Sequence, residues 1–331
     1  MKTLLVGLGS IGRRHLANLR TLDPTGLITV CHQYTRPHEA GEGPKAADRV
    51  VYSLEDGLNP LPDMALITGP SPLHISTAEA LAQKGVHLFI EKPLSHRLDG
   101  VKKFLDLCRE RRVVVQVGYN FRFYEPFVAL RRALNEGKIG RVLNITAEVG
   151  QYLPDWRPGT DYRRNVTARS DLGGGVLLEL SHEIDYVRWL VGEVAAVSAQ
   201  VARVSDLEID VEDTAEVTLK FENGALGHIH LDFIQRGYAR SCRIIGSEGT
   251  IRWDSQDNRV RLFSAASKTW SDIFPSSPLD RNVMYVEELK HFLKCVAEDR
   301  APAVGGEEGL RVMEIVMAAR KSSEAGQVVS L

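Results

Sequence analysis

The chain opens with Thr3-Leu4-Leu5-Val6-Gly7-Leu8-Gly9-Ser10-Ile11-Gly12, an apolar run followed by glycines in the spacing G-x-G-x-x-G. We expect a strand over the apolar run and a helix over Ile11-Arg20. Gly7 would permit the tight turn, Gly9 would let the backbone approach a pyrophosphate, and Gly12 would let the helix pack closely on the strand. The N–H groups at the start of the helix, among them those of Ser10 and Ile11, would then face the phosphates. This context predicts a dinucleotide site rather than a simple glycine-rich turn.

The first third of the chain alternates short apolar runs with helical stretches. The expected strands are Leu4-Val6, Ile28-His32, Met64-Thr68, His87-Ile90 and Val113-Val117, and the expected helices are Ile11-Arg20, His74-Lys84 and Leu98-Glu110. Apolar strands separated by helices indicate βαβ units and a parallel sheet covered on both faces. Right-handed crossovers place the loops after all these strands at one edge of the sheet. We therefore expect a Rossmann-type, doubly wound domain over residues 1–122.

A different pattern begins after Arg122. Longer strands are expected at Val142-Gly150, Thr214-Phe221, Ala225-Ile234, Cys242-Ile245 and Thr250-Asp254, and helices at Phe127-Glu136, Met284-Glu298 and Leu310-Ser323. Asn223-Gly224 is a strong signal for a hairpin between two of these strands. The pattern predicts an α+β domain with a large, mostly antiparallel open sheet over residues 123–331.

The composition bounds the class of protein. The 331 residues contain 44% hydrophobic and 25% charged side chains, with a formal net charge of −2. The length and this balance suit an ordinary globular protein of about two domains, and the charge gives no electrostatic case for binding nucleic acid or a membrane surface. Four scattered cysteines without Cys-x-x-Cys spacing indicate reduced thiols. With no expected leader or membrane span, we expect a cytoplasmic protein.

The end of the second expected strand should select the cofactor. An acidic residue there would accept a hydrogen bond from a ribose 2′-hydroxyl and favour NAD. This chain instead has His32-Gln33-Tyr34-Thr35-Arg36. Thr35 and Arg36 could bind a 2′-phosphate, so NADP is favoured and NAD stays an alternative; Arg36 could also belong to a solvated loop.

A second candidate group lies at the same sheet edge. Glu91-Lys92-Pro93 directly follows the strand His87-Ile90, which places the Lys92 amine at a carboxyl end, where ligands of such sheets bind. A lysine beside a bound nicotinamide could take part in proton transfer. The alternative is an ordinary exposed lysine paired with Glu91.

A third candidate lies in the stretch from Gly173 to Tyr186. Three glycines precede a stretch with helical apolar spacing, and His182 lies off the apolar stripe. Glu179 and Asp185 lie three residues to either side of His182 on the expected helix, so they would share its face. A carboxylate beside an imidazole suits general-base chemistry, whereas a solvated polar face is the alternative.

Two further polar clusters are weaker signals. His228, His230 and Asp232 alternate along one strand, but side chains of one strand rarely converge on an ion and no fourth ligand is evident, so we expect no metal. Trp156-Arg157-Pro158-Gly159 and Asp161-Tyr162-Arg163-Arg164 form an aromatic, charged loop. Trp156, Arg157, Tyr162 and Arg163 could bind a hydroxylated or anionic substrate, or could simply be solvated.

Taken together, these residues resemble the Gfo/Idh/MocA oxidoreductases, the group of glucose-fructose oxidoreductase and inositol dehydrogenase. The resemblance spans nearly the whole chain. It is carried by Gly7-x-Gly9-x-x-Gly12, Gly69-Pro70-Ser71-Pro72-Leu73-His74, Glu91-Lys92-Pro93, Val117-Gly118-Tyr119-Asn120-x-Arg122-Phe123 and Gly173-Gly174-Gly175 through His182-x-x-Asp185.

The resemblance implies reversible hydride transfer between NAD(P) and a secondary alcohol or ketone of a sugar, inositol or sugar nucleotide. It also implies a homodimer or homotetramer formed through the open sheet. Lys92 and His182 match the catalytic positions of the family. Its other motifs imply that Pro70, Ser71, His74 and Glu91 bind the cofactor and that Asn120 and Arg122 bind substrate. Some members have an acidic residue four positions before the histidine. This chain has Leu178 at that position, and Glu179, three positions before His182, is the nearest substitute.

We therefore expect His182 to take the proton of a substrate hydroxyl while Lys92 stabilises the alkoxide. Two alternatives stay open. The chain could reduce an imine or a conjugated system, as some relatives do. It could also be a regulator that senses NADPH without catalysis, although such a protein has no need of Lys92 or His182.

Overall fold

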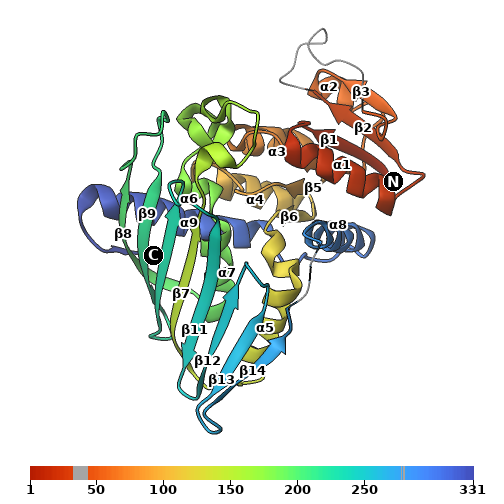
Figure 1. Ribbon diagram of the computed structural model, residues 1–331. Helices are drawn as coiled ribbons and strands as arrows, with labels where there is room; N and C mark the ends of the chain where they lie inside the picture. The colour runs from red at the N-terminus through yellow and green to blue at the C-terminus, as the bar shows by residue number, and fades with distance from the viewer. Residues whose placement is uncertain (33–43, 277, 279) are drawn as a thin grey trace. The chain divides into compact units, whose positions relative to one another are not determined.

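The computed structural model describes residues 1–32, 44–276, 278 and 280–331 (Figure 1). The chain divides into two compact units. Unit 1 comprises Met1–Asn120 and Met284–Arg311, and unit 2 comprises Phe121–Val283 and Val312–Leu331. The observed crossing into unit 2 lies two residues before the expected boundary at 122. Within the described part of the chain, no helix is long and apolar enough to cross a membrane.

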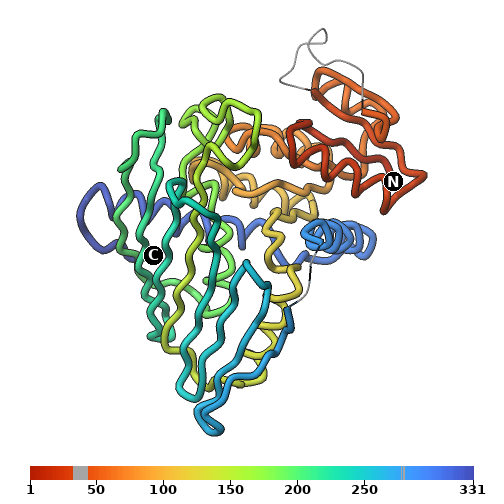
Figure 2. The backbone as a smooth tube through the Cα atoms, viewed as in Figure 1, coloured from red at the N-terminus to blue at the C-terminus, as the bar shows by residue number. Residues whose placement is uncertain are grey.

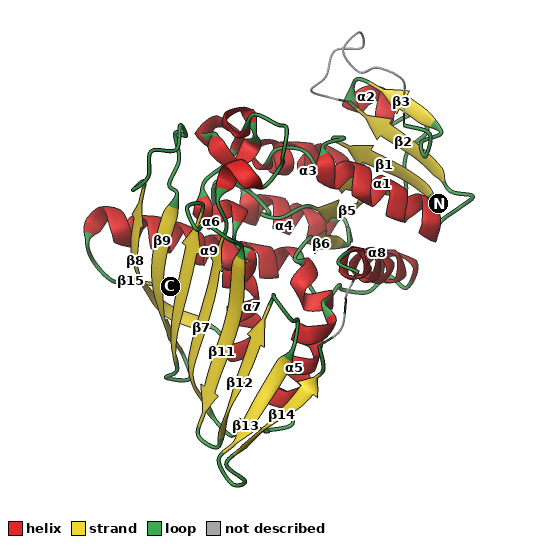
Figure 3. Cartoon of the chain, viewed as in Figure 1, coloured by secondary structure: helices red, strands yellow, loops and turns green. Residues whose placement is uncertain are grey.

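Unit 1 is built on a six-stranded sheet in the order β3-β2-β1-β4-β5-β6, with every neighbouring pair parallel (Figure 3). The strands are β1 Lys2–Val6, β2 Leu27–Cys31, β3 Arg49–Val51, β4 Met64–Ile67, β5 His87–Ile90 and β6 Val115–Val117. The helices between them are α1 Ser10–Leu22, α2 Leu54–Gly57, α3 His74–Ala82 and α4 Val101–Glu110. This strand order is that of the Rossmann fold, whose switch point lies between β1 and β4. The expected Rossmann domain is confirmed.

One apolar cluster fills one side of this sheet. It joins Leu16 and Leu19 of α1, alternate residues of the strands such as Leu66 and Phe89, and Leu289 and Phe292 of helix α8 (Asn282–Ala297). The sequence had assigned α8 to the second domain. It belongs instead to unit 1 from Met284 on, because its apolar face completes the cover of the parallel sheet.

Unit 2 contains a nine-stranded sheet in the order β14-β13-β12-β11-β7-β10-β9-β8-β15, whose strands follow one another across the tube drawing in Figure 2. Their bounds are β7 Val142–Gly150, β8 Val194–Ala202, β9 Thr214–Phe221, β10 Leu226–Asp232, β11 Ala239–Gly246, β12 Gly249–Asp254, β13 Val260–Ser264, β14 Thr269–Phe274 and β15 Val329–Ser330. All neighbours are antiparallel except β7 and β10. The expected large, mostly antiparallel sheet is thus confirmed, with one parallel pair that the sequence did not indicate.

The strands of this sheet bury one face. Along β9, buried Ala215, Val217 and Leu219 alternate with exposed Glu216 and other polar residues. The expected hairpin between β9 and β10 forms at Gly224, where φ is +85°. Glycine adopts such an angle without steric cost. Helices α5 Glu125–Asn135, α6 Val176–Glu179, α7 His182–Val191 and the C-terminal part of α9 Gly306–Ala325 complete the unit.

Candidate active site

The glycine loop after β1 has no room for side chains at two of its three glycines. Gly7 has a φ of +95°, and a Cβ there would lie 2.8 Å from the amide nitrogen of Gly69. A Cβ on Gly12 would lie 2.3 Å from the carbonyl oxygen of Gly7. The hydroxyl of Thr68 donates a hydrogen bond to that same carbonyl at 2.7 Å, which fixes the turn against the end of β4.

Gly9 marks the open side of the same loop. Among the described residues, no atom beyond the chain neighbours of Gly9 lies within 4 Å of a Cβ built at this position, so the loop is open there. Gly9 precedes α1, and the first turn of the helix carries no acidic residue, so its N–H groups offer a positive end to an anion. Ser10 and Ile11 begin this helix. The loop therefore fits the pyrophosphate of a dinucleotide, as the sequence predicts.

The residues expected to select the cofactor lie mostly outside the described chain. Thr35 and Arg36 fall within residues 33–43, and His32 is the last residue described before them. The His32 ring stacks on Tyr52 with centroids 6.1 Å apart. Burial lowers the pKa of His32, and the positive charge of Arg13 on α1 contributes in the same direction.

The loop after β4 is held to the loop after β5 by His74. The Nδ1 atom of His74 lies 2.9 Å from the carbonyl oxygen of Pro93, and Nε2 lies 2.9 Å from that of Gly69. The side chain is fully buried, and burial lowers its pKa. Both ring nitrogens thus face protein carbonyls. His74 joins two loops through its ring nitrogens, and its contact with the cofactor stays a prediction. Pro70 and buried Ser71 lie at the start of the same loop, where cofactor contact stays a prediction.

Lys92 is half-buried at the carboxyl end of β5, as expected from its place in the sequence. The preceding residue, Glu91, is buried, and its Oε1 atom lies 2.5 Å from Nε2 of His15 on α1. The other oxygen of Glu91 accepts a hydrogen bond from the Lys92 amide at 3.1 Å. The carboxylate of Glu91 is thus bound to the protein. The alternative of a surface lysine paired with Glu91 does not describe this arrangement.

The stretch around His182 is not one helix. Helix α6 ends at Glu179, Leu180 and Ser181 form a break, and His182 is the first residue of α7. Glu179 therefore lies on a different helix from His182, contrary to the expected shared face. Its carboxylate accepts a hydrogen bond from the Thr167 hydroxyl at 3.2 Å. Its catalytic role stays a prediction.

Asp185 and Arg122 bind each other. The two carboxylate oxygens of Asp185 accept three hydrogen bonds from Arg122, between Nε and Oδ1 at 3.2 Å, Nε and Oδ2 at 3.0 Å, and Nη2 and Oδ1 at 2.6 Å. Both residues are buried. The sequence assigned Asp185 to catalysis and Arg122 to substrate. In the structure these groups join the start of unit 2 to the helix that carries His182, and their catalytic and substrate roles stay predictions. Asn120, the third residue of that prediction, is buried at the end of unit 1.

Three residues that the sequence did not single out support His182. Its ring packs on Phe121 with centroids 5.2 Å apart, and the guanidinium of Arg240 lies 4.1 Å from the centroid of the same Phe121 ring. Glu183, fully buried, accepts hydrogen bonds from Arg240 at 2.6 and 2.8 Å. This pairing raises the pKa of Arg240 despite burial, which lowers it. The sequence carries one signal for Glu183: it is an acidic residue between His182 and the apolar stripe of the helix.

The loop expected to bind substrate is largely tied to itself. Trp156 donates its indole N–H to the carbonyl of Gln151, and Arg163 pairs with Asp161 and Glu208. Glu208 also donates its amide to the Tyr162 hydroxyl. Arg157 is exposed. Substrate binding by Trp156, Arg157, Tyr162 and Arg163 stays a prediction. A substrate would have to compete with Asp161 and Glu208 for the guanidinium of Arg163.

Histidines on β10 form ion pairs with acidic neighbours. His230 lies between Glu216 and Asp232, at 2.6 and 2.9 Å, and His228 lies 3.0 Å from Glu216. The hydrogen bond to Asp232 contributes most to raising the pKa of His230, to about 9. Among the residues that the structure describes, no group of three His, Cys, Asp or Glu side chains could hold a metal ion.

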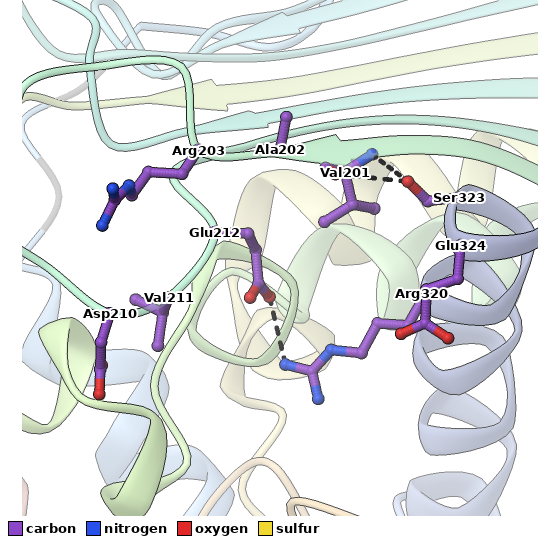
Figure 4. A pocket seen from close by; sticks show the side chains of 9 residues that line it. All are labelled: Val201, Ala202, Arg203, Asp210, Val211, Glu212, Arg320, Ser323 and Glu324. Atoms are coloured by element: carbon purple, nitrogen blue, oxygen red, sulfur yellow. Dashed lines mark hydrogen bonds and ion pairs between the residues drawn. The ribbon is translucent and has the colours of Figure 1, made fainter.

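A cavity of about 420 Å³ in unit 2 contains none of the predicted site residues. It is lined by Val201, Ala202, Arg203, Asp210, Val211, Glu212, Arg320, Ser323 and Glu324. Figure 4 shows Glu212 and Arg320 pointing toward one another, and Arg320 donates to Glu212 at 3.2 Å. The same Glu212 oxygen accepts a hydrogen bond from the Leu177 amide of α6 at 3.4 Å. This pair supports the glycine-rich entry to the His182 segment.

The fold and the glycine cradle define a dinucleotide-binding protein, and comparison with known families defines it further. Residues 1–119 match the family model described as "Oxidoreductase family, NAD-binding Rossmann fold", and residues 131–331 match "Oxidoreductase family, C-terminal alpha/beta domain". The chain belongs to the Gfo/Idh/MocA oxidoreductase family. The resemblance in its motifs is thus confirmed.

Individual relatives cover the whole chain. It is 32% identical to myo-inositol 2-dehydrogenase of Thermotoga maritima over 346 residues, which span 100% of this chain and 98% of the relative. It is 26% identical to an NAD⁺-dependent scyllo-inositol 2-dehydrogenase of Bacillus subtilis, spanning 100% and 96%. Among solved structures, levoglucosan dehydrogenase in complex with NADH superposes with a TM-score of 0.88 at 22% identity, spanning 100% and 98%. The last of these shows a shared fold.

Proposed function

We propose that this oxidoreductase transfers hydride between a nicotinamide and a secondary alcohol or ketone of a sugar, inositol or sugar nucleotide. The observation that carries the proposal is the position of Lys92. It lies at the sheet edge that also bears the glycine cradle, and the preceding residue, Glu91, is held by buried His15. Relatives named as inositol and sugar dehydrogenases support the class of substrate. When bound, the nicotinamide would supply or accept the hydride.

The roles of the protein groups follow from their chemistry. His182, half-buried at the start of α7, takes the proton from the reacting hydroxyl or returns it to a ketone. Lys92 stabilises the developing negative charge on the substrate oxygen as an ammonium donor. The Asp185–Arg122 and Glu183–Arg240 pairs hold α7 in place without entering the reaction.

The test is a nicotinamide absorbance assay with NAD(P)⁺ and a panel of inositols, aldoses, an anhydro sugar and sugar nucleotides, and with NAD(P)H and the corresponding ketones. Turnover of at least one carbohydrate, lost in Lys92→Met with cofactor affinity retained, is the expected result. Cofactor binding without turnover on any member would favour a sensor. Turnover confined to imines or conjugated carbonyls would favour the other reductase class.

We propose NADP as the preferred cofactor, with NAD as the alternative. Arg36 supports this preference from the expected position of a 2′-phosphate, and Arg13 on α1 is a second candidate cation because its charge contributes to the lowered pKa of His32. Arg36→Ala and Arg13→Ala should each weaken NADPH binding while leaving NADH binding unchanged, and Arg109→Ala on α4 serves as a matched surface control. Equal affinities of the native protein for the two cofactors would contradict the preference.

We propose a homodimer or homotetramer formed through the outward face of the unit 2 sheet. In the strand register, exposed Arg243, Arg252 and Arg261 lie directly opposite one another, an arrangement that is unfavourable between like charges. Arg243 pairs with Thr146, and exposed Glu148 lies two residues further along the same strand. Exposed Glu216 lies two residues from Thr218 on β9, so a second copy could place these acidic groups against the arginines. Light scattering of the native protein and of Arg252→Glu, which should dissociate, tests this assembly. We also propose a cytoplasmic location, which suits four buried cysteines that form no disulfide among the described residues.

A further inference from the structure

Two buried histidines contact the residues that flank Lys92, one on each side. His15 binds the carboxylate of Glu91, which precedes the lysine, and His74 lies against the carbonyl of Pro93, which follows it. Both imidazoles are fully buried. They come from different elements, α1 and the start of α3. The backbone on either side of the lysine is thus attached to the rest of unit 1 at two independent points.

The contact with His15 is a strong one. A carboxylate only accepts hydrogen bonds, so Nε2 of His15 donates to Glu91 across the 2.5 Å separation. The ring of His15 is held in turn by edge-on contacts with Phe89 and Tyr285, at 5.0 and 6.1 Å between centroids. His15 therefore has one orientation, in which it binds the carboxylate.

The Glu91 carboxylate has little freedom on its other sides. Its second oxygen accepts from the Lys92 amide at 3.1 Å. A Cβ added to Gly118, at the end of β6, would lie 3.0 Å from that oxygen, so the carboxylate lies directly against the Gly118 backbone. A side chain at residue 118 would push the carboxylate away.

The contact with His74 joins Lys92 to the loop after β4. A neutral imidazole can donate to only one of the two carbonyls that it faces at 2.9 Å. Whichever carbonyl accepts, the ring spans the gap between Gly69 and Pro93. The loops after β1, β4 and β5 are therefore joined through α1 and these two rings, and they include the residues that form the glycine cradle.

We propose that His15 and His74 are positioning residues that fix the backbone around Lys92 and hold it in register with the glycine cradle. This inference rests on the proposed role of Lys92 in hydride-transfer chemistry. Neither histidine contacts substrate or takes part in a proton transfer. Their effect on turnover passes through the place of the lysine amine, where a displacement of about 1 Å can cost on the order of 100-fold in rate.

A double-mutant cycle separates positioning from general structural damage. His15→Leu should lower kcat about 100-fold in the native background and by less than about threefold in Lys92→Ala, because a misplaced lysine matters only while the lysine is present. The same pattern is expected for His74→Leu. Equal fold losses in the two backgrounds would overturn the proposal. His87→Gln is the matched control, since His87 lies at the opposite end of β5 and accepts from the Val114 amide; its kcat should match that of the native protein.

Two milder variants cover the case in which His15→Leu does not fold. His15→Gln keeps an N–H donor near the position of Nε2 and should recover most of the activity. Gly118→Ala removes no polar group but displaces the Glu91 carboxylate, and it should lower kcat with little change in KM for the substrate. A native kcat in Gly118→Ala with normal folding would contradict the proposal.

A second readout needs no turnover. Acetylation of Lys92 with acetic anhydride, followed by mass spectrometry, reports the environment of the amine relative to exposed Lys84 in the same protein. His15→Leu, His74→Leu and Gly118→Ala should each change the ratio of the two rates severalfold, and His87→Gln should not. An unchanged ratio in all three variants refutes the positioning role. If no carbohydrate is turned over by the native protein, the proposed function fails while this measurement still decides the inference.

Discussion

Replacing Asp185 with asparagine separates a structural role from a catalytic one. The Asp185 side chain is 0% exposed and that of Arg122 only 5%, and three hydrogen bonds join them. Asp185→Asn keeps the shape of the side chain but removes the negative charge that Asp185 places against the buried guanidinium. Removing one partner of such a pair costs about 3–5 kcal/mol, a large part of the about 5–15 kcal/mol that stabilises a typical protein.

Urea unfolding followed by circular dichroism would measure this loss, with fluorescence as a local probe, because Trp189 lies 5.8 Å from the Arg122 guanidinium. The double variant Arg122→Met/Asp185→Leu should recover most of the stability, since apolar residues of similar volume often replace a buried pair without loss. Asp171→Asn, which breaks an exposed pair with Arg169, is the control and should change stability little.

The result that would refute this reasoning is a stable but inactive Asp185→Asn. If its unfolding free energy fell by less than about 1 kcal/mol while turnover disappeared, Asp185 would act on the substrate, as the sequence had predicted. A loss of stability, with normal turnover in the fraction that stays folded, would confirm that Asp185 holds α7.

Other predictions concern the cradle and the sheet face. Gly12→Ala should abolish cofactor binding, because its Cβ would lie 2.3 Å from the Gly7 carbonyl oxygen, whereas Gly9→Ala should fold normally and lose only affinity for the cofactor. Calorimetric titration with NADPH checks both variants, and unchanged affinity in Gly12→Ala would contradict the account. The His230 pKa is raised from 6.5 to about 9, so its ion pairs contribute stability that is fully present below pH 6.5 and is lost as pH rises through about 9. His230→Gln should therefore remove that part of the pH dependence of unfolding, and the same pH dependence in both proteins would show that another group is responsible.

Local pattern was enough to predict much of the fold. The alternation of apolar runs and helical stretches predicted the Rossmann sheet, and Asn223-Gly224 predicted the β9–β10 hairpin, because both are encoded by neighbouring residues. The short strand β3 was missed, since three residues carry too little periodicity. Helix α8 was placed in the wrong unit, because its amphipathic pattern does not say which sheet it covers.

The site was harder to predict because its contacts join residues that lie far apart in the chain. Arg122 and Asp185 are 63 residues apart in the chain, and His15 and Glu91 are 76 apart, so no spacing rule links either pair. The break between α6 and α7 was hidden because apolar residues continue at helical spacing through Leu180. His15 did leave a signal, as a polar residue on the face of α1 that also carries Leu16 and Leu19.

Transfer of deuterium from a nicotinamide labelled at C4 tests the central claim most directly. The native protein, supplied with labelled NADPH and a panel of keto sugars and ketoinositols, should place the label on the carbon that becomes the alcohol. Lys92→Met should bind NADPH with native affinity yet transfer label at least about 100-fold more slowly, the scale of one lost electrostatic contact in the transition state. Cofactor binding without transfer to any substrate, or equal transfer by Lys92→Met, would contradict the account.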